Sequence, residues 1–312
     1  MKSLSVRFLC RLQNNGVFSA YKGSMLRGAL GTSLRRAVCV VQKSDCPQCL
    51  LRSTCVFPRL FTAASAPKDG VAAPLPSPPF CLEPPHDRQT NYAAGETFSF
   101  GLKLFSYATD YLPYFIHAFT LAGQRGMGRG TEHGQGTFLV EEVLQDAASI
   151  YDARTGQLHD VVTRDLPLPA PCREDGNGLL RCRLVTPLRF KAENRLSATL
   201  DFTTLFRLIL RRIKNLCALD GETFRLPQNE FSALFQAASN VTIVENALRW
   251  EDWSRYSSRQ RTVMRLGGLT GRITYQGPVA MFREYLGFAC RTHIGKQSSF
   301  GLGALELCQD AP

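Results

Sequence analysis

The chain has 312 residues, enough for two ordinary domains, and 44% of them are hydrophobic while 20% are charged. This composition excludes a chain that is disordered throughout, because each half can bury a core of its own. A formal net charge of +11 favours a polyanionic partner, nucleic acid ahead of an anionic membrane surface. No run of about 18 apolar residues occurs and the first residues alternate like a strand, so we expect a cytoplasmic protein without a membrane span.

The first half of the chain has the pattern of a strand, a helix, two strands, a helix and a last strand. Within the first helix, leucines recur at every fourth residue from Leu26 to Leu34, and Ser24 is the expected N-cap. A glycine-rich loop, "GQRGMGRGTEHGQG", precedes the last strand. The expected elements span residues 3–13, 24–41, 80–83, 96–105, 111–122 and 137–144.

The second half repeats this order, with one short extra helix and a second glycine-rich loop before the closing strand. Its elements are expected at residues 179–188, 201–219, 229–238, 241–250, 268–276 and 278–290. The order βαββαβ is that of a ferredoxin-like domain, an antiparallel sheet with two helices on one face. We therefore predict an α+β protein of two such domains in tandem. Domain one is residues 1–150 with a cysteine-containing insertion at about 39–79, followed by a connection at 151–178 and domain two at 179–312.

Several stretches along the chain carry a specific resemblance. They are "GSMLRGALGTSLRRAVC", "CPQCLLRSTCVFPRLF", "YLPYFIHAFTLAGQRGMGRG", "LVTPLRFK", "WEDWSRYSSRQRTVMRLGGLTGRITYQG" and "HIGKQSSFGLGALEL". In this order the chain resembles the CRISPR precursor-RNA processing endoribonucleases of the RAMP superfamily. The resemblance implies cleavage of RNA without a metal ion, in which the ribose 2′-hydroxyl attacks the adjacent phosphate and leaves 2′,3′-cyclic phosphate and 5′-hydroxyl ends. Such a reaction needs a proton acceptor, a proton donor and positive charge at the phosphate.

Few residues are expected to carry this chemistry. His293 flanks the second glycine-rich loop, and an imidazole titrates near neutral pH, so we predict that it transfers the proton. The alternative is a histidine that ends a helix and bonds to nearby backbone. Lys296, inside the loop, is predicted to place positive charge at the phosphate. Many family members have a histidine near the first helix, whereas none here precedes His86, which leaves Tyr21 and Arg27 as further catalytic candidates or a protein that binds without cutting.

Basic residues beside aromatic residues and in glycine loops are the expected RNA contacts. The segment "SRYSSRQRTVMRLGG" has four arginines and no acid, so its arginines would meet phosphates while Tyr256 stacks on a base. A solvated basic segment is the alternative. The predicted RNA-binding residues are Arg255, Tyr256, Arg259, Arg261, Arg265, Arg125, Arg129, Arg35, Gly295, Ser298, Ser299, Gly301 and Gly303.

Four cysteines lie close together at the end of the first expected helix. Cys39, Cys46, Cys49 and Cys55 are spaced C-x6-C-x2-C-x5-C, which can close a tetrahedral site. We predict a structural zinc ion, ahead of an iron–sulfur cluster, with reduced unliganded thiols as the alternative. Catalysis itself is expected to need no cofactor.

These observations predict an endoribonuclease that cuts CRISPR repeat RNA in a precursor transcript to give mature guide RNAs. The expected partners are that repeat RNA and other subunits of a CRISPR effector complex. The main alternative is a non-catalytic RAMP-type subunit that holds guide RNA, and a more distant one is a zinc-bearing regulator that binds DNA.

Overall fold

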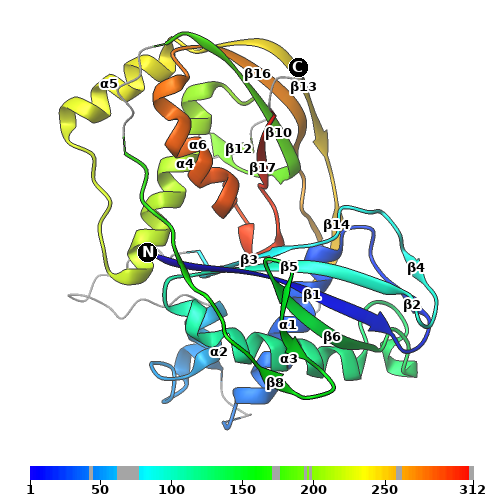
Figure 1. Cartoon of the computed structure of the whole chain (residues 1–312). Coiled ribbons are helices and arrows are strands. Elements are labelled where there is room, and N and C mark those ends of the chain that lie inside the picture. Colours follow the sequence, from blue (N-terminus) through cyan, green and yellow to red (C-terminus); the bar gives the residue numbers. More distant parts are fainter. Residues whose placement is uncertain are drawn as a thin grey trace. The chain divides into compact units, whose positions relative to one another are not determined.

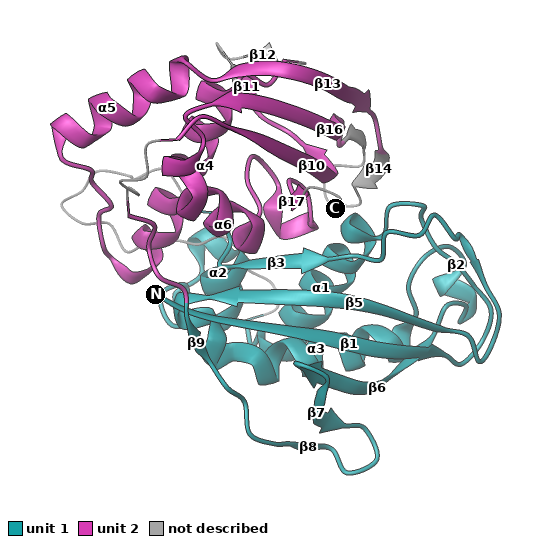
Figure 2. Cartoon of the chain, turned by 45° about the horizontal axis from the view of Figure 1, so that its top comes forward, with its two compact units in different colours: residues 1–165 teal, residues 166–312 magenta. Residues whose placement is uncertain are grey.

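The computed structural model describes residues 1–41, 45–61, 77–170, 176–192, 195–196, 199–257 and 262–308 (Figure 1). The chain divides into two compact units, residues 1–165 and 166–312 (Figure 2). Part of the expected connection belongs to the first unit, because short strands between residues 148 and 165 extend its sheet. No helix among the described residues is both long and apolar enough to cross a bilayer.

The sheet of the first unit has the ferredoxin-like strand order. Its central strands run in the order β3-β5-β1-β6, and every neighbouring pair is antiparallel. The strands β7 and β8 continue the sheet beyond β6, and β9 pairs with β1. The strands are β1 (Lys2–Leu12), β3 (Phe80–Glu83), β5 (Thr97–Phe105), β6 (Phe138–Gln145), β7 (Ala148–Asp152), β8 (Gln157–Leu158) and β9 (Arg164–Asp165), with a separate pair β2 (Gly16–Val17) and β4 (Asn91–Tyr92).

Alternating apolar residues form the core between this sheet and its helices. Phe8 lies opposite Phe100 across β1 and β5, and their rings stack with centroids 4.8 Å apart. Phe119 packs edge-on against Phe8 at 5.0 Å, which places α3 on this face of the sheet. The helices are α1 (Lys22–Val38), α2 (Val56–Phe61) and α3 (Leu112–Arg125). The N-cap of α1 is Tyr21, so the prediction of Ser24 as N-cap is wrong.

The second unit repeats the strand order, as the sequence predicted. Its four-stranded sheet runs β13-β16-β10-β17 with antiparallel neighbours, the counterpart of β3-β5-β1-β6. Its helices α4 and α6 lie on one face of the sheet (Figure 2). The elements are β10 (Gly178–Leu188), α4 (Phe202–Cys217), α5 (Gln228–Ser239), β13 (Thr242–Glu251), β16 (Gly268–Gly277), α6 (Arg283–Thr292) and β17 (Leu305–Cys308), with the short pairs β11 (Lys191–Ala192) with β12 (Arg195–Leu196) and β14 (Ser254–Ser257) with β15 (Thr262–Arg265).

Helix α4 is fixed at its start and along its buried side. The Asp201 carboxylate accepts a hydrogen bond from the Thr204 amide at 2.8 Å, which satisfies one of the unpaired donors of the first turn. The buried Arg212 donates from Nε to the carbonyl of Thr292, 3.0 Å away, at the end of α6. This contact places a positive charge at the negative end of the α6 dipole and ties the two helices together.

Candidate nucleic-acid interface

The second glycine-rich loop, residues 293–304, folds tightly between α6 and β17. Its backbone has positive φ at both Gly295 and Gly303, 81° and 75°. A Cβ atom at Gly303 would lie 1.8 Å from the carbonyl oxygen of Ile294, and one at Gly295 would lie 2.7 Å from the carbonyl oxygen of Arg189. These two positions therefore need glycine, because a side chain would meet backbone that cannot move aside.

Several amides of this loop already have acceptors within the protein. The N–H groups of Gly301 and Gly303 donate to the carbonyls of Ser298 and Pro187, at 2.8 and 3.1 Å. Ser298 and Ser299 are each only 3% exposed. The loop was predicted to offer these amides and hydroxyls to phosphate. In the structure these amides bond to backbone carbonyls and both serines are buried, whereas the side chain of Lys296 is exposed.

Four cations gather around the loop, and we call them the loop cation cluster: Lys296, Arg189, Lys191 and Arg211. The pKa of Lys296 is lowered, first by partial burial and then by the positive charges of Lys191, Arg211 and Arg189. The Lys296 amide donates to the Arg189 carbonyl at 2.7 Å, and the Arg189 guanidinium donates to the carbonyl of Gly267 at 3.1 Å. Because like charges repel each other here, an anion bound among them relieves that repulsion. The loop cation cluster is thus the candidate site for a phosphate group in the second unit.

Sequence reasoning found Lys296 but missed its three neighbours. Arg189 and Lys191 follow β10 within the quoted stretch "LVTPLRFK", and Arg211 lies on the exposed side of α4. Only the fold brings these segments to the loop, so no spacing rule would have joined them. Their basic character was the one available signal.

The other predicted catalytic residue of this loop, His293, is buried. Its side chain is 2% exposed, and Nδ1 lies 3.3 Å from the carbonyl oxygen of Leu302. It caps the end of α6, with its amide bonded to the Ala289 carbonyl at 3.1 Å. This geometry is that of the alternative interpretation, a helix-ending histidine bonded to backbone. Catalysis by His293 stays a prediction, and it requires RNA to reach a covered imidazole.

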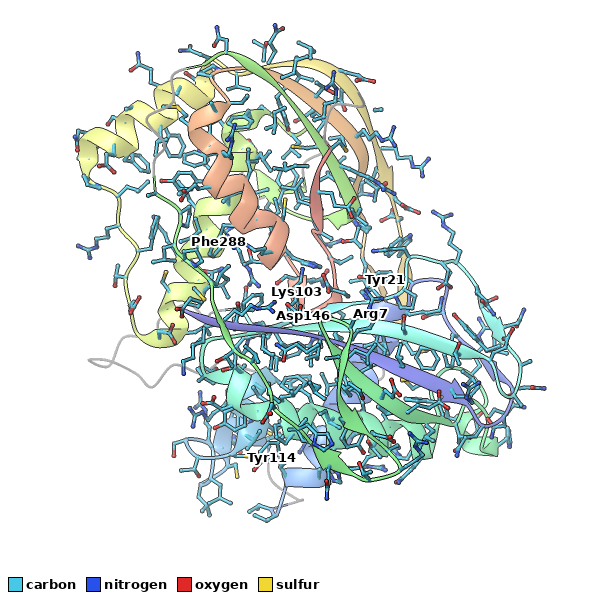
Figure 3. The ribbon with its side chains drawn as sticks, in the orientation of Figure 1. Arg7, Tyr21, Lys103, Tyr114, Asp146 and Phe288 are labelled. Atoms are coloured by element: carbon cyan, nitrogen blue, oxygen red, sulfur yellow. The ribbon has the colours of Figure 1, made fainter. Side chains whose placement is uncertain are left out.

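Both catalytic candidates of the first unit belong to the start of α1: Tyr21, labelled in Figure 3, is its N-cap, and Arg27 lies in its second turn. Burial, and next the thiol of Cys81, raise the pKa of Tyr21 well above its usual value, so its phenol stays protonated and cannot serve as a base near neutral pH. The Arg27 guanidinium lies 4.9 Å above the ring of Phe61. The adjacent Lys22 is 1% exposed and pairs with the Asp87 carboxylate at 2.8 Å, which gives its ammonium a structural partner.

The remaining predicted RNA contacts lie in three parts of the chain. Arg125, at the end of α3, and Arg129, in the first glycine-rich loop, are both exposed. Arg35 lies in the last turn of α1, beside the four cysteines. Arg259 and Arg261 lie outside the described residues, and so do the side chains of Arg255, Tyr256 and Arg265.

The four clustered cysteines share one small pocket. Cys39, Cys46, Cys49 and Cys55 line it together with Arg35, and all four are reduced. Within the described part of the chain, however, no three Cys, His, Asp or Glu side chains are placed to hold a metal ion. The structure therefore gives no support to the predicted zinc site, although the thiols lie near one another.

Comparison with known proteins finds a separate family model for each part of the chain. Residues 182–305 match the family model of the CRISPR-associated endoribonuclease Cas6, and residues 1–163 match the N-terminal domain model AF_1859_N. No curated protein matches the chain. The product complex of Cas6 (TTHB231) from Thermus thermophilus is 16% identical with a TM-score of 0.56, and the match covers 99% of this chain and 100% of that one. The product complex of Cas6 (TTHA0078) is also 16% identical, with a TM-score of 0.54 and the same coverage.

A larger protein contains the same fold. In a Cas6-RT-Cas1--Cas2 complex, the matched chain is 13% identical with a TM-score of 0.53; the match covers 98% of this chain but 29% of that one. At such identities the solved structures establish the fold, which is two ferredoxin-like units in tandem. Residues 182–305, in the second unit, carry a domain that matches the family of CRISPR-associated Cas6 endoribonucleases.

Proposed function

We propose that this protein cleaves CRISPR repeat RNA within a precursor transcript and so produces mature guide RNAs. The observation that carries the proposal is the loop cation cluster, since four positive charges meet at the glycine-rich loop within the residues that match the Cas6 model. The net charge of +11 adds a long-range attraction for the RNA backbone. Docking to other subunits of an effector complex remains a prediction from the sequence.

The proposed reaction uses the nucleophile that RNA already carries. The 2′-oxygen loses its proton and bonds to the adjacent phosphorus, the bond to the 5′-oxygen breaks, and that oxygen takes up a proton. The products are a 2′,3′-cyclic phosphate and a 5′-hydroxyl, and no oxidant or cofactor enters the balance. In this scheme Lys296 and its neighbours stabilise the charge that develops on the phosphate oxygens. An approaching phosphate also raises the lowered pKa of Lys296, which keeps its ammonium charged during the reaction.

Cleavage of repeat RNA in EDTA tests this function directly. We expect the protein to cut repeat RNA at one position in EDTA, and to stop when the ribose 5′ to the scissile phosphate is 2′-deoxy, because its nucleophile is then missing. Gel analysis and mass spectrometry of the ends would check both results. Cleavage of the deoxy substrate, or a strict need for a divalent ion, would contradict the proposed chemistry.

One structural observation favours the alternative of an RNA-binding subunit without cleavage. His293 is the one histidine among the described residues of the second unit, and it is buried, so that unit itself offers no exposed imidazole beside the loop cation cluster. The same assay separates the two functions. Tight binding of intact repeat RNA, with no cut after long incubation, would identify the subunit.

A structural zinc ion at the four cysteines remains a separate prediction. We expect purified protein to contain about one equivalent of zinc, and a variant with Cys46→Ser and Cys49→Ser to contain none, because two of four thiolate ligands are then lost. Elemental analysis without added chelators measures both. The matched control is Cys290→Ser in the second unit, which should leave the zinc content unchanged. Wild-type protein without metal would leave the thiols simply reduced, as the structure has them.

A further inference from the structure

Helices α4 and α5 form an open pocket that none of the predicted contacts uses. Its volume is about 620 Å³, within the range of small-ligand sites. Its lining is unusual in composition, since apolar and cationic side chains make up all of it. The lining residues are Arg207, Leu210, Arg211, Lys214, Phe231 and Phe235.

Two phenylalanines of α5 form the aromatic wall of this pocket. Phe231 and Phe235 lie one helical turn apart, and their ring centroids are 4.5 Å from each other. Phe235 is anchored, because its ring also packs against Phe206 of α4 at 5.4 Å. Phe231 is 37% exposed, so part of its ring remains in contact with solvent. An exposed ring on an anchored partner is a platform for a flat apolar group.

The opposite wall is a row of cations on α4. Arg207, Arg211 and Lys214 are exposed and follow one another at helical spacing, so they share a face of the helix. Arg207 lies 5.6 Å above the ring of Phe235, which holds its guanidinium at the pocket. Glu230 precedes Phe231 but does not line the pocket. The negative charge of Glu230 acts on Tyr285 instead: burial first, and then this charge, raise the pKa of Tyr285 to about 12.

Arg211 connects this pocket with the loop cation cluster. It lines the pocket, and its positive charge also lowers the pKa of Lys296 in the glycine-rich loop. A phosphate bound at Lys296 and a group bound beside Phe231 would therefore both lie near Arg211, within the second unit. Nucleic acid has such a repeat, a charged phosphate followed by a flat base.

We propose that the pocket binds one unpaired base of the RNA whose phosphate occupies the loop cation cluster. The base stacks on Phe231, while Arg207, Arg211 and Lys214 contact its own and the next phosphate. This inference rests on the proposed function, since it assumes an RNA ligand. The other ligand with matching chemistry is an acidic amphipathic peptide. RNA fits better because the shared Arg211 continues the pocket into the loop cation cluster, where a row of phosphates is matched and an apolar helix face is not.

Binding of a short unstructured RNA tests the pocket without requiring repeat recognition or cleavage. Two probes are used: octaadenylate measures affinity, and octauridylate with 2-aminopurine at one central position measures stacking, because the fluorescence of that base falls when it stacks and weakly stacking uridines do not quench it beforehand. We expect wild-type protein to quench this fluorescence, and Phe231→Ala to lose the quenching and about tenfold in affinity. Phe231→Tyr keeps a ring of the same shape and should bind like wild type, which controls for damage to α5.

The cationic wall has its own matched pair of variants. Lys214→Ala should weaken octaadenylate binding and reduce the slope of log affinity against log salt by about one, because one phosphate contact is lost. Arg225→Ala removes an equally exposed cation just before α5 that does not line the pocket, and it should leave the slope unchanged. Both substitutions are on the surface, so folding should not obscure the result.

The outcomes separate this inference from the proposed function. Equal quenching and affinity in wild type and Phe231→Ala would overturn the base pocket, even when repeat RNA is cleaved normally. The same conclusion follows when wild-type protein ignores octaadenylate but binds an alternating Glu-Leu peptide in a Phe231-dependent way. Absence of repeat cleavage, with quenching intact, would instead refute the endoribonuclease and leave the base pocket standing.

Discussion

Replacing Lys296 by alanine should lower the single-turnover rate of repeat RNA cleavage by about 10²- to 10³-fold. The reason is electrostatic, since removing the cation that we propose faces the scissile phosphate should raise the energy of the charged transition state by about 3–4 kcal/mol. Affinity should fall much less, because Arg189, Lys191 and Arg211 remain to hold the ground-state phosphate. Rates at saturating protein, measured alongside equilibrium binding, separate the two effects.

Two controls make this experiment specific. Lys296→Arg preserves the charge and should recover most of the rate, whereas Arg225→Ala removes a cation away from the site and should change little. An unchanged rate in Lys296→Ala would show that the loop cation cluster is not where cleavage occurs. His293→Ala belongs in the same series: a loss of roughly 10²-fold with intact folding and affinity would restore the imidazole as the proton carrier despite its burial.

The second large effect expected is on stability, from Gly303→Ala. At φ of 75° an alanine is strained by about 1–2 kcal/mol, and its Cβ would also lie 1.8 Å from the Ile294 carbonyl oxygen. The backbone must shift to relieve this overlap, and the shift breaks the backbone hydrogen bonds that Gly303 makes with Ile294 and Pro187. We expect the free energy of unfolding to fall by about 3–5 kcal/mol in urea titrations. RNA cleavage at temperatures where the variant remains folded should fall as well.

Gly221→Ala is the matched control for that substitution. Gly221 has nearly the same φ, 74°, but a Cβ there would meet nothing within 4 Å. Gly221→Ala should therefore lower the free energy of unfolding only by the backbone strain, about 1–2 kcal/mol. Similar losses for both variants would mean that the close packing of the glycine-rich loop contributes nothing to stability.

Much of the fold could be predicted because its strands are half-buried and alternate. The run from Phe98 to Leu104 shows one apolar face, and β3 was predicted with the bounds it has, Phe80–Glu83. The start of α1 was misjudged because a serine is a common N-cap, while here Tyr21 precedes the helix without a side-chain cap. The strands after residue 148 were missed because they are two to five residues long, too short for a periodic signal.

The site was less predictable than the fold, for a physical reason. Sequence identifies a residue type, but exposure and neighbours depend on how distant segments pack. His293, Ser298 and Ser299 were expected to be exposed because they lie in a polar loop. The loop adopts positive φ values, however, and all three side chains are buried. Arg211 looked like an ordinary solvated cation on an amphipathic helix. In the fold it lines a pocket with residues of α5, and its charge lowers the pKa of Lys296 in the glycine-rich loop. Neither neighbour is visible in its local sequence.

Two consecutive arginines of α4 connect the pocket with the start of the glycine-rich loop. Arg211 is exposed and lines the pocket, while the buried Arg212 donates a hydrogen bond to the end of α6, where the glycine-rich loop begins. This hydrogen bond thereby links the helix that lines the pocket to the residue just before the loop. RNA bound at both the pocket and the loop, as proposed, dissociates only when both contacts are broken at the same time. Each remaining contact keeps the RNA close enough for the other contact to form again. Slow release of the RNA is therefore the expected consequence of this link between α4 and α6 if RNA binds as proposed.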